Sequence, residues 1–192
     1  MQKSLTRTQQ ARREDIVSAA IAVIHRDGCA AASVDKIAKE AKTSKSTVLY
    51  HFKTKEAIYD EVVLTLFRKG AAYMTDRIAA AGTYRDKLRA YLRSNLQFIA
   101  EHAAHVSAVH RIMENGGPGS DGSDPVTPLA ALLSAGQQAG EFGSFDPTVT
   151  ALVIRAAIDG ASYHFTTRTD LDFDRYIGET VQLFDKATAA SI

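Results

Sequence analysis

Two short helical patterns, joined by a few polar residues, constrain the fold of this chain more than any other stretch. Residues 33–56 read SVDKIAKEAKTSKSTVLYHFKTKE. The first pattern has Ser33 as its N-terminal cap and apolar residues at helical spacing: Val34, Ile37, Ala38 and Ala41. The second begins at Thr43 or Ser44, and its apolar residues are Val48, Leu49 and Phe52. Helices this short are unstable alone in water, so they must pack together on a neighbour, as helix-turn-helix units do.

A helical wheel of the second pattern separates an apolar side from a polar side. At about 100° per residue, the apolar residues cluster near Lys45, and the opposite side carries Ser46, Thr47, Tyr50 and His51. This outer face has hydrogen-bonding side chains and no carboxylate. A helix that enters the DNA major groove needs such a face, because it must reach base edges without repelling phosphate. A solvated surface helix is the alternative, but such helices usually include Glu and Asp, so the pattern favours DNA reading.

Charge is distributed unevenly along the chain. Residues 1–56 contain 11 Lys and Arg against 6 Asp and Glu, whereas residues 57–192 contain 12 against 16. The positive end is the one with the two short helices, which indicates a polyanionic partner for that end. Residues 1–13 carry Lys3, Arg7, Arg12 and Arg13 without an acid. This segment fits a solubilising tail and a DNA-contacting arm equally well.

Composition limits the class of protein. A length of 192 residues with 45% apolar residues supports a real core in one large or two small domains. The sequence has no apolar run near the roughly 18 residues of a membrane span and no signal-peptide pattern, so we expect a cytoplasmic protein. One cysteine, Cys29, permits no internal disulfide and fits a reducing compartment. Four prolines and no useful strand-like alternation indicate an all-helical fold.

The N-terminal patterns predict a three-helix head followed by a long helix. A first helix over about 9–27 ends at Gly28. It packs against the two short helices, and the three helices together form the N-terminal head. A long helix over about 55–81 starts after Thr54 and leads out of the head. The next helical region, 84–115, starts at a capping box, Thr83 and Asp86. We expect this region to break near His102–His105, because one helix of that length would outrun a compact domain.

The C-terminal patterns predict a larger helical domain. A loop over 115–125 precedes a helix that ends near Gly140. The last two helices, about 147–166 and 172–190, have apolar surface beyond one stripe, which predicts a two-fold dimer; the alternative is that both faces are simply core. The predicted fold class is all-α with about nine helices. Its N-terminal helix-turn-helix domain covers 1–54, and its helical ligand-binding and dimerisation domain covers 55–192.

The motifs over residues 10–60 resemble those of the TetR (tetracycline-repressor) family of bacterial transcriptional regulators. The family's Phe-x-Ser/Thr-Lys-Glu stretch is present as Phe52-Lys53-Thr54-Lys55-Glu56. The other matching residues are Ile16, Ala19, Ala20, Gly28, Ser33, Ile37, Ala38, Ala41, Ser44 and Thr47. Beyond residue 60 the resemblance is one of length and helical architecture, as in the family's variable ligand domains.

The resemblance implies roles for individual residues. Phosphates would be bound by Ser33, His51 and Lys55. Base edges would be approached by Lys45, Ser46, Thr47 and Tyr50. The full predicted DNA-binding set adds two residues of the turn: Lys42 and Ser44.

Two positions depart from the family pattern. The turn, commonly Ala-Gly-Val-Ser, is Ala-Lys-Thr-Ser here, so Lys42 replaces a glycine that favours a tight turn while adding a cation near phosphate. Leu49 stands where relatives carry a phosphate-contacting tyrosine. That contact is not transferred to Leu49, and we hypothesise that the next residue, Tyr50, substitutes for it.

In the larger domain the resemblance implies an effector cavity. The predicted lining mixes apolar and polar residues, each of which could instead be plain core: Phe98, His102, Val109, Met113, Leu133, Asp159 and Tyr163. A cluster of three histidines and two glutamates looks like a metal site: His102, His105, His110, Glu101 and Glu114. We expect no metal or cofactor, because His110 points away from the other two histidines and no cysteine joins them. No nucleophile elbow, glycine-rich phosphate loop or ordered carboxylate pair is present, so we expect no enzyme.

The sequence therefore predicts a homodimeric, ligand-responsive DNA-binding regulator, most simply a repressor released from a palindromic operator by a small-molecule effector. The expected partners are double-stranded DNA, the effector and a second copy of the chain, with no membrane. The alternative is a helical small-molecule-binding or enzymatic protein whose basic N-terminal end binds another anionic partner.

Overall fold

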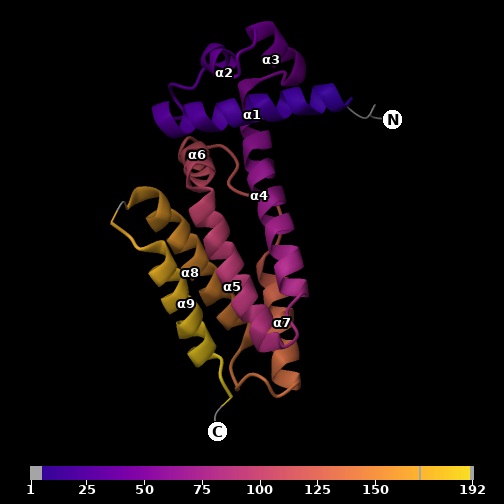
Figure 1. The fold of residues 1–192 in the computed structure, drawn as a ribbon, viewed down its shortest axis with the longest axis vertical. Helices are drawn as coiled ribbons and strands as arrows, with labels where there is room; N and C mark the ends of the chain where they lie inside the picture. Colours follow the sequence, from indigo (N-terminus) through magenta and orange to yellow (C-terminus); the bar gives the residue numbers. More distant parts are fainter. Residues whose placement is uncertain (1–5, 169, 191–192) are drawn as a thin grey trace. The chain divides into compact units, whose positions relative to one another are not determined.

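The computed structural model describes residues 6–168 and 170–190, which form nine α-helices (Figure 1). In chain order they are α1 (Arg7–Asp27), α2 (Val34–Glu40), α3 (Lys45–His51), α4 (Lys55–Ala79), α5 (Tyr84–Glu101), α6 (Ala103–Glu114), α7 (Val126–Gln138), α8 (Pro147–Thr167) and α9 (Phe173–Ala187). Extended pairing within the described ranges is one isolated bridge, between Phe142 and Ala189. The predicted all-α class, helix-turn-helix and helix number are confirmed.

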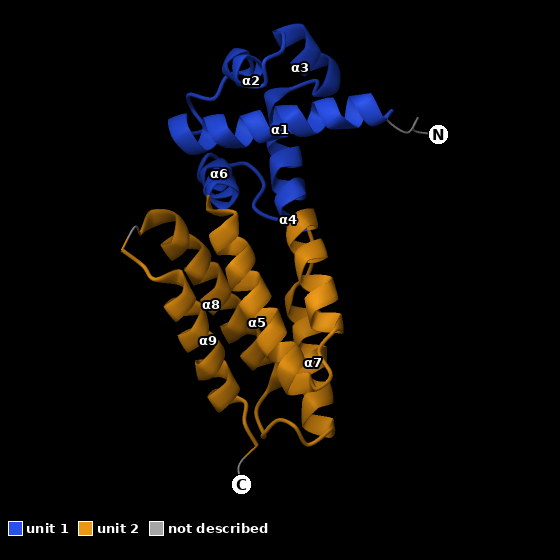
Figure 2. Cartoon of the chain, in the orientation of Figure 1, with its two compact units in different colours: residues 1–67, 104–121 blue, residues 68–103, 122–192 orange. Residues whose placement is uncertain are grey.

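The helices form two compact units, shown in separate colours in Figure 2. The first unit contains the described residues up to Phe67 together with Ala104–Asp121. The second contains Arg68–Ala103 and the described residues from Gly122 onward. Helix α4 contributes its first half to one unit and its second half to the other, while α6 joins the N-terminal helices. The predicted domain boundary after residue 54 stays a prediction.

In the first unit, α2 and α3 pack on each other and on α1 (Figure 1). Apolar residues from all three helices are completely buried between them: Ile16, Ala20, Val23, Ile24, Ile37 and Val48. Helix α1 starts at a capping box, in which Thr6 Oγ1 accepts from the Gln9 N–H. It ends at Gly28, as predicted, where the N–H donates to the Ile24 carbonyl over 2.9 Å.

Helix α6 contacts α4 and approaches Gly28, the residue that follows α1, within this unit. His105 is buried, and its Nε2 lies 2.8 Å from the carbonyl oxygen of Val62 on α4. Because a carbonyl only accepts, the imidazole donates in this bond. Near the end of α6, Arg111 Nη1 would lie 3.3 Å from a Cβ added to Gly28. The first unit is therefore held together partly by residues distant in sequence.

Gly28 has backbone angles that only glycine adopts without strain, with φ 82° and ψ 164°. We expect Gly28→Ala to lower the free energy of unfolding by about 1–3 kcal/mol, because a side chain in this region of φ/ψ space is strained. Urea denaturation measures the change. Gly82→Ala is the matched control, since an added Cβ meets nothing within 4 Å there. Equal stability of the two variants would contradict the strain argument.

The long helical region of the sequence breaks where it was predicted to break. Helix α5 ends at Glu101, His102 is its C-cap, and α6 begins at Ala103. The predicted start is confirmed too, because Thr83 Oγ1 accepts from the Asp86 N–H over 3.0 Å. The break lets α5 belong to the second unit and α6 to the first.

In the second unit, α5 packs against α7, α8 and α9, and α7 packs against α8. The fully buried side chains come mostly from α5 and α8: Leu88, Leu92, Leu96, Leu133, Ile154 and Ile158. Helices α5 and α9 are joined by Asp185, which accepts two bonds from Arg85 and two from Arg89, at 2.7–3.0 Å. These bonds, those from Arg85 first, hold the pKa of the Asp185 carboxyl well below its usual range.

The depressed pKa of Asp185 makes part of the stability dependent on pH. A carboxyl whose pKa is lower in the folded chain than in the unfolded chain stabilises the fold above the unfolded pKa, near 4, and loses that effect as pH falls further. We expect Asp185→Asn to cost about 1–2 kcal/mol at pH 7, since the two arginines are partly exposed. Urea titrations at pH 7 and pH 3 should show a smaller difference between variant and wild type at pH 3. A difference independent of pH would contradict this role.

Within the described ranges, none of the helices combines the length and apolar character needed to cross a membrane.

Candidate nucleic-acid interface

Helix α3 begins at a cluster of hydroxyl groups. Ser44 is its N-cap, and its Oγ accepts from the Thr47 N–H over 3.1 Å. The same oxygen lies 2.8 Å from the hydroxyls of Ser46 and Thr47. Serine favours the N-cap because its oxygen satisfies an amide that the helix leaves unpaired. The three hydroxyls therefore share hydrogen bonds that fix the first turn of α3.

The exposure of α3 agrees with the predicted wheel in part, because Lys45, which the wheel placed on the apolar side, is exposed. Val48 is fully buried, and Tyr50 is 63% exposed. Ser46 is exposed as well, whereas Thr47 and His51 are half-buried. The Tyr50 hydroxyl accepts a long bond of 3.4 Å from Gln9 Nε2, and its ring meets the His51 ring edge-on at 5.1 Å. The helix thus presents polar and aromatic side chains on the side away from the core.

One carboxylate lies beside α3 that the wheel did not reveal. Asp35 of α2 pairs with Lys45, its Oδ2 lying 2.8 Å from Nζ, and both side chains are mostly exposed. Such an exposed pair contributes about 0–1 kcal/mol, so Lys45 can leave it at little cost. Sequence reasoning missed the pair because it joins two helices, and a wheel describes only one.

Arg13 of α1 fixes the far end of α3. Its Nη1 donates to the backbone carbonyl of His51 over 2.7 Å, and its Cζ lies 4.0 Å from the centre of the Phe52 ring. Its Nη2 lies 2.6 Å from Glu61 Oε2 on α4, a pair in which both side chains are 22% exposed. One guanidinium therefore connects α1, the end of α3 and the start of α4. The sequence offered no local signal for this role, because the partners lie 38 and 48 residues away.

The surroundings of His51 favour the neutral form of its imidazole. Partial burial lowers the pKa of its imidazole below the ordinary value of 6.5, and the charges of Arg13 and Arg12 lower it further. A neutral imidazole carries one N–H, so it would meet a phosphate as a single hydrogen-bond donor. The predicted phosphate contact of His51 is compatible with this state and stays a prediction.

Lys42 occupies the left-handed region of backbone space in the turn between α2 and α3. Its φ is 50°, and it is the one non-glycine residue in the described ranges with positive φ. This is the position at which the TetR-family turn commonly has glycine. The left-handed conformation costs a lysine about 1–2 kcal/mol. Lys42 adopts it nonetheless, so the backbone of the turn has the conformation that glycine would favour. The exposed side chain leaves the ammonium group accessible to an anion.

The other predicted phosphate contacts lie at helix starts. Ser33 caps α2, its Oγ accepting from the Lys36 N–H over 3.2 Å. Lys55 is the first residue of α4, and its Nζ lies 5.4 Å from the centre of the Tyr59 ring. Of the predicted N-terminal arm, Lys3 lies outside the described residues. Arg7 opens α1 and is exposed.

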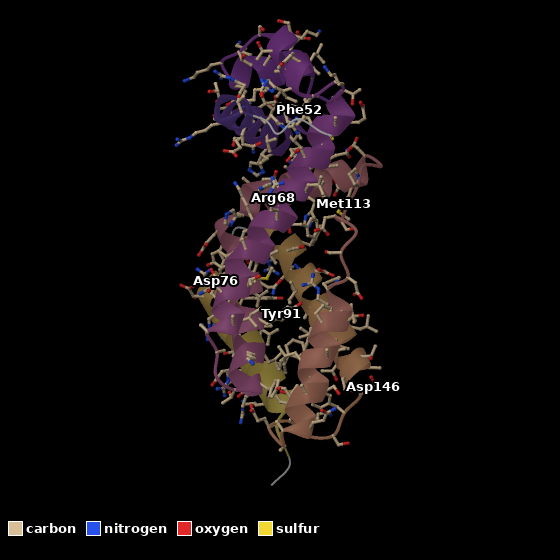
Figure 3. The ribbon with its side chains drawn as sticks, turned by 90° about the vertical axis from the view of Figure 1, so that its right-hand side faces the viewer. Phe52, Arg68, Asp76, Tyr91, Met113 and Asp146 are labelled. Atoms are coloured by element: carbon tan, nitrogen blue, oxygen red, sulfur yellow. The ribbon has the colours of Figure 1, made fainter. Side chains whose placement is uncertain are left out.

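The predicted cavity residues are distributed over both units. In the second unit, Phe98 and His102 stack at 4.1 Å, and Leu133 is fully buried. Val109 and Met113 belong to α6 in the first unit; Val109 is buried and Met113 is 46% exposed (Figure 3). Asp159 and Tyr163 of α8 have exposed side chains. Phe98 and His102 meet directly, and the set as a whole stays a prediction.

A pocket of about 380 Å³ lies in the second unit between α5 and α9. Its lining residues differ from the predicted set: Gln97, Ala100, Glu101, Asp172, Phe173, Asp174 and Ile177. Among the described residues, no group of three or more His, Cys, Asp or Glu side chains is placed to hold a metal ion.

Helix α8 carries an apolar stripe on its outer side. Its large members are Val149, Leu152, Val153 and Tyr163, which are 51–58% exposed. Ala156 and Gly160 continue the stripe with small residues, and both are exposed. On α9, Leu183 is 62% exposed. An aligned apolar stripe of this length on a surface helix is typical of a protein interface.

The described residues thus define an all-helical protein whose N-terminal unit contains a helix-turn-helix. Residues 16–62 match the model of the bacterial regulatory proteins of the tetR family. Among proteins with curated descriptions, none matches the sequence significantly.

Solved structures with the same fold are numerous. A tetR-family regulatory protein from Rhodococcus RHA1 is 21% identical, with a TM-score of 0.77 over 94% of this chain and 98% of that one. The regulator AibR, solved with isovaleryl coenzyme A and operator DNA, is 18% identical, with a TM-score of 0.71 over 90% and 97%. The ketosteroid regulator KstR2 of Mycobacterium tuberculosis is 18% identical, with a TM-score of 0.73 over 94% and 96%. Residues 16–62 match the TetR-family model by sequence, and the chain shares the fold of solved TetR-family proteins, which confirms the resemblance.

Proposed function

We propose that the protein is a homodimeric transcriptional regulator that binds a palindromic operator through α3 and is released from it by a small-molecule effector. The observation that carries the proposal is the set of exposed polar side chains on α3: Ser46, Tyr50 and Lys45, whose pair with Asp35 is itself exposed. These side chains supply donors, an acceptor and an aromatic ring to base edges. Lys42 and Lys55, on either side of α3, supply charge for phosphates.

The dimer in this proposal forms through the outer stripe of α8 together with α9. A two-fold interface uses the same surface on both copies, so one apolar stripe is sufficient for self-association. Ala156 and Gly160 let the two copies of α8 approach closely. A dimer presents two α3 helices, which matches an operator with two half-sites about one helical turn apart.

Release by an effector requires a path from the second unit to the first. Helix α4 provides one, because it is continuous from Lys55 to Ala79 and contributes to both units. An effector acts by binding one conformation more tightly than the other, and α4 would transmit the difference. AibR, solved with both an acyl-coenzyme A and operator DNA, supports an arrangement of this kind.

Gel-shift titration with genomic DNA fragments and random-sequence competitor tests DNA binding. We expect selective complexes whose affinity falls steeply with salt, because lysines displace counterions from phosphate. Binding without selectivity, or none, would overturn the proposal and favour the alternative of a helical ligand-binding or enzymatic protein whose basic end meets another anion.

Substitution of Tyr50 tests base reading directly. We expect Tyr50→Ala to weaken selective binding by about 1–3 kcal/mol, roughly 5- to 150-fold, while binding to random DNA changes far less. Lys53→Ala is the matched control for a nearby charge, and it should weaken both kinds of complex alike. Equal losses in selective and random binding for Tyr50→Ala would argue against base contact.

A further inference from the structure

A polar cluster lies within the helical packing of the second unit. Arg155 of α8 reaches α5, where its Nη1 donates to the Tyr91 hydroxyl over 3.2 Å and to Asn95 Oδ1 over 3.4 Å. Asn95 Nδ2 donates in turn to the Tyr91 carbonyl over 2.8 Å. Asn95 is buried, and the Arg155 side chain is only 19% exposed. Figure 3 shows Tyr91 among the helices of this unit.

The positive charge in this cluster is incompletely matched. The carboxylate paired with Arg155 is Asp159, one helical turn along α8, whose Oδ1 lies 2.8 Å from Nη2. The Asp159 side chain is 69% exposed, so water screens the pair and its contribution is about 0–1 kcal/mol. A guanidinium cannot lose its proton at physiological pH, so the charge is permanent.

One donor of the guanidinium is buried and unused. Arg155 Nε has almost no exposed surface, and it donates to no atom of the described chain. A buried donor without an acceptor costs about 1–3 kcal/mol. On a planar guanidinium, Nε and one terminal nitrogen point along the same edge, and that edge fits the two oxygens of a carboxylate.

We propose that Arg155 binds the carboxylate of the effector, and that the effector is an amphiphilic monocarboxylate. The proposal rests on the proposed function, whose effector it assigns to a chemical class. Tyr91 takes part because its oxygen accepts from Arg155 and its O–H remains to donate to the ligand. The apolar part of the ligand follows from the surroundings, since Leu88 and Ile158, one helical turn from Tyr91 and Arg155 on the same helix faces, are buried apolar residues.

The carboxylate of the ligand competes with Asp159 for the same guanidinium. Removing the Asp159 charge should therefore strengthen anion binding, whereas a purely structural cluster would only lose an ion pair. Replacing Arg155 by Lys keeps the charge and removes the planar edge, so it should weaken binding. These opposite effects separate a ligand site from a structural network.

The test uses sodium octanoate and, as a neutral control of the same length, octanamide. The readout is the ¹⁵N–¹H resonance of Arg155 Nε, identified by its absence in Arg155→Lys. We expect octanoate to shift this resonance saturably and octanamide to leave it in place. If octanoate at up to about 10 mM leaves this resonance unmoved, the proposal is overturned, because that concentration is well above what even a weak site requires.

The variants are compared by octanoate titration with matched thermal unfolding curves. We expect affinity to fall at least tenfold in Arg155→Lys and about threefold in Tyr91→Phe, and to rise about threefold in Asp159→Asn. If Arg155→Lys unfolds, the other two variants still decide the matter, and unchanged affinity in both would overturn the proposal. No DNA is present, so failure here leaves the gel-shift result standing, and failure of the gel shift leaves this one standing.

Discussion

Val153→Glu should dissociate the proposed dimer into monomers and lower the affinity for an operator about 100-fold or more. Val153 lies in the middle of the outer stripe of α8 and is 54% exposed in the single chain. In a two-fold dimer the new glutamates would face apolar surface and each other, and an unpaired charge in such a place costs several kcal/mol.

The loss of operator affinity follows because a monomer lacks the DNA-binding N-terminal head of the second copy. When two heads are linked, the second binds from a high effective concentration, which strengthens binding by about 10²–10⁴ over one head. A monomer keeps its α3 helix and its non-specific affinity, but it binds only one half-site. The single-head complex should therefore survive at low salt and disappear at physiological salt.

Ala131→Glu is the control for this experiment, because it adds the same charge on the exposed side of α7. Sedimentation velocity gives the oligomeric state, and the gel shift gives the affinity. We expect the control to remain dimeric and to bind as the wild type does. A Val153→Glu protein that stays dimeric would mean that the stripe of α8 is not the interface.

The fold was predictable where local signals determine it. The glycine at position 28 and the start at Thr83 depend on residues within one helical turn, and the structure confirms both. The second short helix was predicted to start at Thr43 or Ser44, and its cap is Ser44. The break after Glu101 followed from length alone. Secondary structure, and hence the fold class, could therefore be read from neighbouring residues.

The contacts that hold α3 and α6 in place could not be predicted, because they join residues that meet only after folding. Asp35 pairs with Lys45 across two helices. His105 joins α6 to Val62, 43 residues earlier, and so places α6 with the N-terminal helices. Hydrophobic periodicity says which side of a helix is buried but not which helix covers it. The sequence could therefore identify α3 but not the residues of other helices that contact it.

Arg13 is the residue whose loss should show most clearly that α3 depends on its support. We expect Arg13→Ala to lower the free energy of unfolding by about 2–4 kcal/mol, since it removes two charge-assisted hydrogen bonds and leaves Glu61 half-buried without this cation. It also frees the last turn of α3, because the His51 carbonyl loses its donor. Affinity for operator DNA should fall about tenfold or more even where the protein is fully folded.

Arg12→Ala is the matched control, because Arg12 is the neighbouring arginine on α1 and makes a single exposed pair with Asp15 at 3.4 Å. Its effect on stability should stay within about 0.5 kcal/mol. Urea denaturation gives the free energies, and gel shifts at 15 °C, where both variants are folded, give the affinities. If Arg12→Ala and Arg13→Ala lose the same affinity, the loss reflects net charge near DNA. If Arg13→Ala alone loses it, the position of α3 depends on the bonds from Arg13 to His51 and Glu61.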